Sequence, residues 1–287
     1  MRLLITQPQV GIFERSEHDP SAGMLPIHMA WPCLPCESHG LTAVCCAQER
    51  ECICLKRPGY GIISRMPCVP GPSAMCFSPC GRYLYQLSSE ADCVHTRLTA
   101  TGELLYAAPA GVFPRSMQMD ENGRRLLVAG GAVPEAYVLT APELICERII
   151  HTKHACFAAG FWQEGLVLVC AAEGNDIQTA IYTLREKAVR PRKLIELSGP
   201  PGGMCICPDG RHMLLSTPDG LMKIRLATGE ILWNRAEWPL CMRLCCKRNW
   251  ALVSDTLDGK VCLIDHHHPW EQVPIGAGEG IQACFLT

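Results

Sequence analysis

The segment His-Thr-Lys-His, residues 151–154, contains the residues whose type and spacing best suit chemistry. His151 and His154 lie three residues apart, and an imidazole can exchange protons near neutral pH or bind a metal ion. Arg115 is a second candidate, because a guanidinium group holds a carboxylate or a phosphate through paired hydrogen bonds. These three residues are the first candidates for a binding or catalytic site.

Two other patterns resemble metal sites. Cys33 and Cys36 have CxxC spacing, but the other cysteine pairs in the chain lack the spacing of a second zinc knuckle. Three histidines at 266–268 cannot all converge, because consecutive strand residues point to opposite sides. We therefore expect strand packing for the two cysteines, an exposed polar turn for the three histidines, and no metal or cofactor. No GxSxG, Walker, HExxH or GxGxxG motif occurs in a suitable context, so the catalytic residues stay unknown.

The composition excludes several classes of protein. With 48% hydrophobic and 19% charged residues, the chain of 287 residues is expected to be globular and well packed. The net charge of -2 and the absence of long basic runs argue against nucleic acid as a partner. No apolar run is long enough to span a membrane or to act as an export signal, which predicts a cytoplasmic protein. The 20 cysteines are then expected to be reduced thiols that pack as small hydrophobic residues.

The elements that must position these residues follow a repeat of about 40 residues. The best copies are PSAMCFSPCGRYLY (72–85), PRSMQMDENGRRLL (114–127) and PGGMCICPDGRHML (201–214). Each starts with Pro, has Met three residues later, and carries Gly and Arg at the tenth and eleventh positions. Weaker copies start at Pro32 and Pro239, and in another copy His154 replaces the proline. Each unit reads as four short strands without helical periodicity, which is typical of a β-propeller blade.

The two ends of the chain complete one such unit. The terminal GIQACFLT (280–287) resembles a first strand, and the opening MRLLITQ resembles a second strand. Pairing them in one sheet would close a ring and leave no open edge at the junction. The sequence thus predicts one all-β domain over 1–287, a seven-bladed β-propeller of four-stranded antiparallel blades. The expected blades are 1–31 with 280–287, and then 32–71, 72–113, 114–153, 154–200, 201–238 and 239–279.

The glycines of the repeat are expected to make turns rather than chemistry. Gly81, Gly123 and Gly210 follow turn-forming residues between two apolar runs, at positions that need a positive φ.

The repeats also indicate a family resemblance. SPCGRYLY, MDENGRRLLV and CPDGRHMLL, followed by LTATGELLY and IRLATGEIL, resemble the turns of YVTN-type and lactonase-like seven-bladed propellers. The likeness covers nearly the whole chain, and it is strongest in the third, fourth and sixth blades. A lactonase-like activity would make His151, His154, Arg115 and Glu173 the catalytic or substrate-holding candidates. No motif of the family maps onto these positions, and the fold hosts enzymes and binding platforms alike.

One rim of the ring, where successive blades are joined, is the customary ligand face of the fold. The candidates on this rim are Arg115, His151, His154, Glu173, His28, Trp31 and Trp238. We expect a cytoplasmic scaffold that binds a protein or a small molecule there; a lactonase-like hydrolase with a site at the channel mouth is the alternative. A mouth lined by Trp and Met would favour binding. Converging His, Arg and carboxylate groups would favour hydrolysis.

Overall fold

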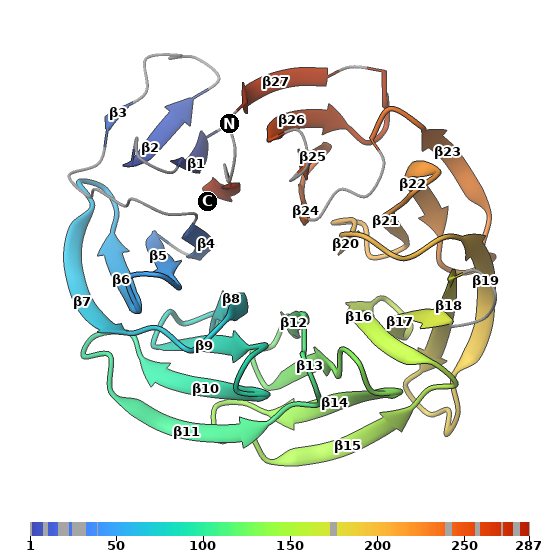
Figure 1. Ribbon diagram of the computed structural model, residues 1–287, viewed down its shortest axis with the longest axis horizontal. Helices are drawn as coiled ribbons and strands as arrows, with labels where there is room; N and C mark the ends of the chain where they lie inside the picture. Colours follow the sequence, from blue (N-terminus) through green and yellow to red (C-terminus); the bar gives the residue numbers. More distant parts are fainter. Residues whose placement is uncertain are drawn as a thin grey trace.

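The computed structural model of the chain describes residues 2–7, 11–16, 23–24, 33–38, 40–172, 177–238, 243–255, 259–270, 272–277 and 282–286. Within these residues the hydrogen-bonded strands form seven four-stranded antiparallel sheets. The sheets stand around a central axis, with one strand of each sheet innermost (Figure 1). The prediction of an all-β propeller with four-stranded antiparallel blades is therefore confirmed.

The strands succeed one another from the axis outward in most sheets. The sheet that contains both ends of the chain has β28 (Gln282–Leu286), β1 (Arg2–Gln7), β2 (Gly11–Ser16) and β3 (Gly23–Met24). The next two have β4 (Cys33–Ser38), β5 (Leu41–Cys46), β6 (Glu51–Lys56) and β7 (Gly61–Pro67), then β8 (Pro72–Phe77), β9 (Tyr83–Ser88), β10 (Cys93–Leu98) and β11 (Leu104–Pro109).

The remaining four sheets follow the same order. They comprise β12 (Ser116–Met119), β13 (Arg125–Ala129), β14 (Glu135–Thr140) and β15 (Cys146–His151); β16 (Ala155–Trp162), β17 (Gly165–Ala172), β18 (Gln178–Arg185) and β19 (Arg192–Ser198); β20 (Met204–Ile206), β21 (His212–Thr217), β22 (Gly220–Arg225) and β23 (Ile231–Arg235); and β24 (Arg243–Lys247), β25 (Trp250–Asp255), β26 (Lys260–Asp265) and β27 (Gln272–Ala277).

Strands from the two ends of the chain pair directly. β1 and β28 are antiparallel, with Leu4 opposite Cys284 and Ile5 opposite Ala283. Leu4 and Ile5 are fully buried, and Leu4 packs with Val44 of the following sheet. The pairing joins the first and last described segments in one sheet, as the sequence suggested.

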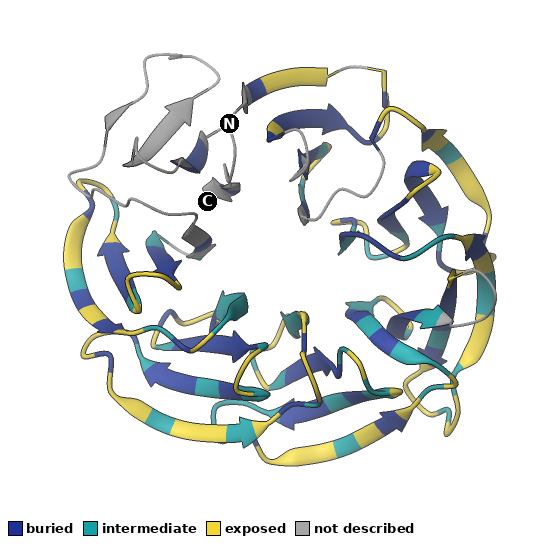
Figure 2. Ribbon diagram, in the orientation of Figure 1, coloured by how far each residue is buried: buried dark blue, intermediate teal, exposed yellow. Residues whose placement is uncertain are grey.

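The apolar core lies in the seams between neighbouring sheets. The second strands show it most clearly, because β5, β9 and β21 are buried at every position after the first. Both faces of these strands are covered by adjacent sheets, and this is why their sequences are continuous apolar runs rather than alternating ones. The outer strands face solvent on one side, and β11 is largely exposed (Figure 2).

The repeated turns have the predicted glycine conformation. Gly81, Gly123 and Gly210 have φ values of 70°, 67° and 62°. At the second of these turns Asp120 Oδ1 accepts hydrogen bonds from the backbone N–H groups of Arg124 and Arg125, at 2.7 and 3.1 Å. The motif is therefore a structural turn that joins the first and second strands of a blade.

Replacing Gly123 by alanine should destabilise the protein more than the same change at Gly210. Both substitutions force alanine into the left-handed region, which costs about 1 kcal/mol. At Gly123 the new Cβ would also lie 2.5 Å from Cδ of Pro79, whereas at Gly210 its nearest neighbour is 3.6 Å away. We expect losses of about 3 and about 1 kcal/mol in the free energy of unfolding, measured by urea denaturation. Equal losses would show that the contact with Pro79 relaxes freely.

Candidate functional site

A cavity of about 710 Å³ lies where the innermost strands surround the axis. Most of its lining comes from β8, β12, β16, β20 and β24 and from the linkers that enter these strands, and the rest comes from β5, β25 and the turns after β5 and β9. The residues that matter for its chemistry are Ser73, Met75, Ser89, Arg115, Ser116, Met117, Phe157, Met204, Cys45, Cys245 and Ser254. The cavity therefore offers hydroxyl, thioether and thiol groups and one cation.

Two positions of the repeat supply much of this lining. The residue after the repeat's first proline is Ser73, Arg115 or Gly202, and each of them lines the cavity. The methionine two residues further on is Met75, Met117 or Met204, and these also line it. Sequence reasoning recorded the methionines as part of the repeat but did not assign them to a site. Their recurrence at one position of three inner strands, β8, β12 and β20, was the signal that could have placed them there.

Arg115, one of the candidates from the sequence, lies in the cavity wall. Its guanidinium carbon is 5.4 Å from the ring centroid of Phe157, within the range of a cation–π contact. The linker before it is held to the preceding sheet, because Ser73 Oγ donates to the carbonyl of Pro114 at 2.8 Å. Among the described residues that line the cavity, Arg115 carries the single charge. An anion that enters the cavity therefore has one fixed cation to meet.

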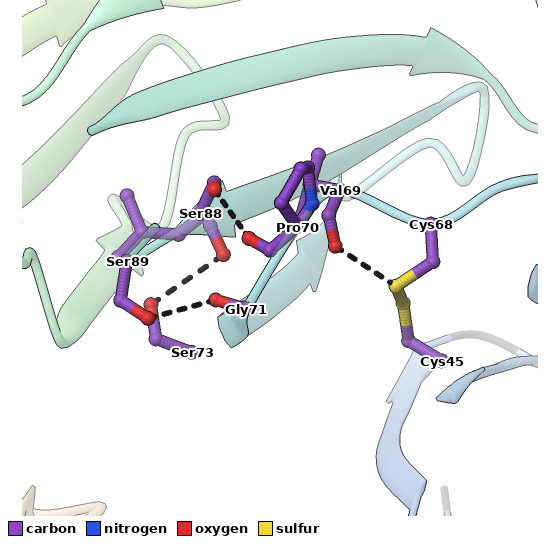
Figure 3. Close-up of a disulfide and its surroundings, with 9 residues drawn as sticks. Cys45, Cys68, Val69, Pro70, Gly71, Ser73, Ser88 and Ser89 are labelled. Carbon is purple, nitrogen blue, oxygen red and sulfur yellow. Dashed lines mark hydrogen bonds between the residues drawn. A yellow bond between two sulfur atoms is a disulfide. The ribbon is translucent and has the colours of Figure 1, made fainter. Parts of the chain in front are cut away.

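The serine hydroxyls near the cavity are engaged with the backbone. Ser73 donates to the carbonyl of Pro114. Ser89 donates to the carbonyl of Gly71 at 2.9 Å (Figure 3). A hydroxyl that donates to a carbonyl keeps lone pairs for a ligand donor. No histidine or carboxylate appears among the described lining residues, so the described lining holds no activated serine nucleophile.

A disulfide joins Cys45 to Cys68 at the edge of this cavity (Figure 3). Cys45 belongs to β5 and lines the cavity, while Cys68 lies in the linker that follows β7. The bond ties the second strand of the sheet to the chain segment that leads into the next sheet. The expectation that the thiols are reduced is wrong for this pair. The two cysteines are 23 residues apart and meet only in the folded sheet, so their spacing in the sequence did not indicate the bond. Other described cysteines, including Cys156, Cys170 and Cys246, are free thiols.

Cys36 of the CxxC pattern packs in the core, as expected. Its side chain is buried beside Ala43 and Phe77. The side chain of Cys33 lies outside the described part of the chain. Within the described residues no group of three or more His, Cys, Asp or Glu side chains is arranged to hold a metal ion.

The two histidines of residues 151–154 do not join Arg115. His151 ends the outer strand β15, its side chain is 74% exposed, and its Nδ1 lies 3.5 Å from Oε1 of Glu135. His154 is half-buried before β16, and Thr152 Oγ1 donates to its carbonyl. Burial lowers the pKa of His154, and the charges of Lys153 and Lys193 lower it further. Neither histidine is among the described residues that line the cavity.

The remaining rim candidates do not add to the described cavity. Trp238 is only 6% exposed and packs with Leu214 and Leu244 in the seam between two sheets. It stabilises this seam and does not fill the channel mouth. His28, Trp31 and Glu173 lie outside the described residues.

The expectation of an exposed turn at the three histidines is wrong for His266. This residue is 2% exposed, whereas His267 and His268 are exposed. Its Nε2 lies 2.8 Å from the carbonyl oxygen of Arg248 and must carry a proton to donate to it. Nδ1 then accepts from Nζ of Lys223, at 3.1 Å. Sequence spacing could not show this pairing, because Lys223 belongs to the neighbouring sheet.

The neutral form of His266 is the one that fits these partners. A second proton on the ring would point from Nδ1 at the amine of Lys223, which is itself buried. Burial lowers the pKa of His266, and this effect outweighs the hydrogen bond to Arg248, which favours the charged form. The network is therefore a structural contact between two sheets.

A second hollow, of about 960 Å³, lies at the other ends of the strands. It is lined by turns that join first and second strands, including Asp120 and Asp209. Four of its charged groups form two ion pairs: Arg125 Nε lies 3.3 Å from Asp120 Oδ2, and Arg185 Nη2 lies 3.2 Å from Glu164 Oε2. The lining of this larger hollow mixes acidic and basic groups, whereas Arg115 is the single charge in the described lining of the axial cavity.

No helix among the described residues has the length and hydrophobicity needed to cross a membrane.

Comparison with known proteins gives similar structures but no similar sequence. No protein-family model matches the chain, and no curated protein matches it by sequence. The periplasmic gluconolactonase PpgL of Pseudomonas aeruginosa is similar in structure, with a TM-score of 0.71, 15% identity and 98% of both chains covered. Kuenenia stuttgartiensis hydrazine synthase has a TM-score of 0.68 and 13% identity, over 84% of this chain and 79% of that one.

A third similar structure is dihydro-heme d1 dehydrogenase NirN in complex with DHE. Its TM-score is 0.60 and its identity 20%, over 83% of this chain but only 55% of that chain. At these levels of identity the comparisons show the propeller fold alone. The resemblance to lactonase-like propellers is thus supported at the level of the fold.

Acidification should destabilise the protein in part through His266. The folded-state pKa of this histidine lies below its ordinary value of 6.5, so the unfolded chain binds the proton more readily. The stability is present above pH 6.5 and is lost as the pH falls below it. His266→Gln, which keeps a donor and an acceptor, should show a smaller loss of unfolding free energy between pH 7 and about pH 5 in urea titrations.

His267→Gln is the control, because this side chain is exposed. His95 and His154, whose pKa values are also lowered, remain in both variants and leave a residual loss. An unchanged pH profile in His266→Gln would contradict the assignment of a neutral, buried His266.

Proposed function

We propose that this protein is a seven-bladed propeller that holds a small, oxygen-rich molecule in its central cavity and acts on it as a lactonase-like hydrolase. The proposed blades are those expected from the repeat, with β28 and β1 closing the ring. The observation that carries the proposal is the position of Arg115, the single charged residue in the described lining, anchored over Phe157.

The lining suits a lactone or the hydroxy acid formed from it. Hydrolysis adds water to the lactone carbonyl carbon, breaks the ring C–O bond and gives a hydroxyl group, a carboxylate and one proton that is released to solvent. Negative charge develops on the carbonyl oxygen during the attack and stays on the product carboxylate. A guanidinium group in a partly enclosed site stabilises both charges. In this proposal Arg115 binds and stabilises charge and does not transfer protons.

The other groups of the cavity fit the neutral part of such a ligand. Ser73 and Ser89 retain lone pairs for ligand hydroxyl groups, while Met75, Met117 and Met204 supply an adaptable apolar wall. Further support comes from the gluconolactonase, whose fold matches this chain over 98% of both.

A non-enzymatic binding scaffold is the second candidate function. The described lining contains methionines and no histidine or carboxylate, which was the expected sign of a binding mouth. In this case the ligand or a partner protein would occupy the same rim without being converted. Its placement in the cytoplasm stays a prediction.

Loss of the Arg115 charge should weaken binding of an anionic ligand. A hydrogen-bonded charge contributes roughly 1.5–3 kcal/mol, so Arg115→Leu should bind gluconate about 10- to 100-fold more weakly by isothermal titration calorimetry. Hydrolysis of glucono-1,5-lactone, followed by proton release, should fall with it. Arg115→Lys should retain part of the affinity, because the charge remains but the paired geometry is lost.

Arg124→Leu is the matched control, because Arg124 is exposed in a turn at the other ends of the strands. It should leave both measurements unchanged. Equal binding in the Arg115 and Arg124 variants would refute the site. Gluconate binding that depends on Arg115, without lactone turnover, would refute the hydrolase and favour the scaffold. If neither gluconate nor glucono-1,5-lactone binds, this ligand class is excluded.

A further inference from the structure

Three thiols meet in the seam between the inner strands of two neighbouring sheets. The Sγ atoms of Cys205, in β20, and Cys246, in β24, are 3.1 Å apart. Cys207, just after β20, packs in the same apolar cluster. The two nearest sulfurs are separated by 41 residues in sequence and belong to adjacent sheets.

Strand geometry brings these sulfurs together. Residues two apart on a strand point to the same side, and this places Cys205 and Cys207 on one face. In β24, the inner strand of the adjacent sheet, consecutive side chains point to opposite sides. Cys245 therefore lines the cavity, while Cys246 packs in the seam. The consecutive cysteines 245 and 246 therefore have different surroundings.

We propose that Cys205 and Cys246 are a site of reversible oxidation, at which a disulfide joins the two adjacent sheets. A disulfide bond is about 2.05 Å long, so the sulfurs need to approach by about 1 Å. Both residues are half-buried and their thiols pack in the seam, so a small oxidant reaches them when the seam opens locally. Cys207 is only 2% exposed and is the less accessible thiol of the cluster.

The oxidant is a small-molecule disulfide such as oxidised glutathione. A thiolate of the pair attacks it, forms a mixed disulfide and releases one glutathione thiol. The second protein thiol then displaces the other glutathione. Overall, two protein thiols are oxidised to one disulfide and one glutathione disulfide is reduced to two thiols.

The thiol pair reacts slowly at neutral pH. The hydrogen bond with Cys205 and burial raise the pKa of the Cys246 thiol well above its ordinary value. Since the thiolate is the attacking species, mildly alkaline buffer favours formation of the bond.

This bond differs in effect from the one between Cys45 and Cys68. That disulfide connects one sheet to the linker that follows it. A bond between Cys205 and Cys246 would cross-link two sheets that otherwise meet through side-chain packing at this point. It would resist separation of the seam that also contains Leu214 and Trp238.

The test compares the full-length protein after incubation with oxidised glutathione or with dithiothreitol at mildly alkaline pH. Peptide mapping without reduction should identify a peptide pair joined through Cys205 and Cys246 in the oxidised sample. The oxidised protein should melt roughly 5 °C higher than Cys205→Ser treated in the same way, because a loop of 41 residues is closed. Both proteins keep Cys45 and Cys68, so the comparison isolates the new bond.

Cys207→Ser is the matched control, and it should retain both the linked peptides and the higher melting temperature. Linked peptides can be sought in the unmodified protein, so the test stands even if a variant fails to fold. Free thiols at Cys205 and Cys246 in a sample whose Cys45–Cys68 bond is intact would overturn the proposal. A bond between Cys207 and Cys246 would overturn it as well.

Discussion

The structure depends on the burial of each sheet between two others. A four-stranded sheet with apolar groups on both faces has no stable exposed form, and only neighbours on either side cover it. Ile53 and Leu55 of β6 illustrate this constraint, since both pack in the same cluster as Leu4 of the adjoining sheet. Pairing of β28 with β1 extends the same requirement to the segments nearest the two ends of the chain.

Sequence reasoning succeeded where the information was local and repeated. The turn glycines, the four-strand unit and the position of Arg115 followed from the spacing of Pro, Met and Gly. It failed where the partner of a residue comes from another sheet. His266 is buried with both ring nitrogens hydrogen-bonded, Nδ1 to the amine of Lys223 and Nε2 to the carbonyl of Arg248. Cys45 meets Cys68 only in the folded sheet. No periodicity in one segment reports such contacts.

The irregular segment at residues 151–154 shows a further limit. A departure from the repeat suggested a functional site, yet His151 lies on the outer strand beside Glu135, and His154 lies before an inner strand without lining the cavity. The residues that differ in the cavity wall lie instead at a position that the repeat conserves in its spacing. The residue after the repeat's proline changes from Ser73 to Arg115 to Gly202, and all three residues line the cavity.

Because this position recurs, the fold largely assigns packing between wedges and lining of the axial chamber to different residues. Most of the fully buried residues that hold the wedges together lie in the second and third strands, whereas the described lining of the axial chamber comes mainly from inner strands and loops of six wedges. Met75, Met117 and Met204 also pack against the clusters between wedges, so a change at one of them alters that packing as well as the chamber. Arg115 belongs to none of these clusters, so the charge of the chamber can be rewritten there with the least effect on the framework that supports it.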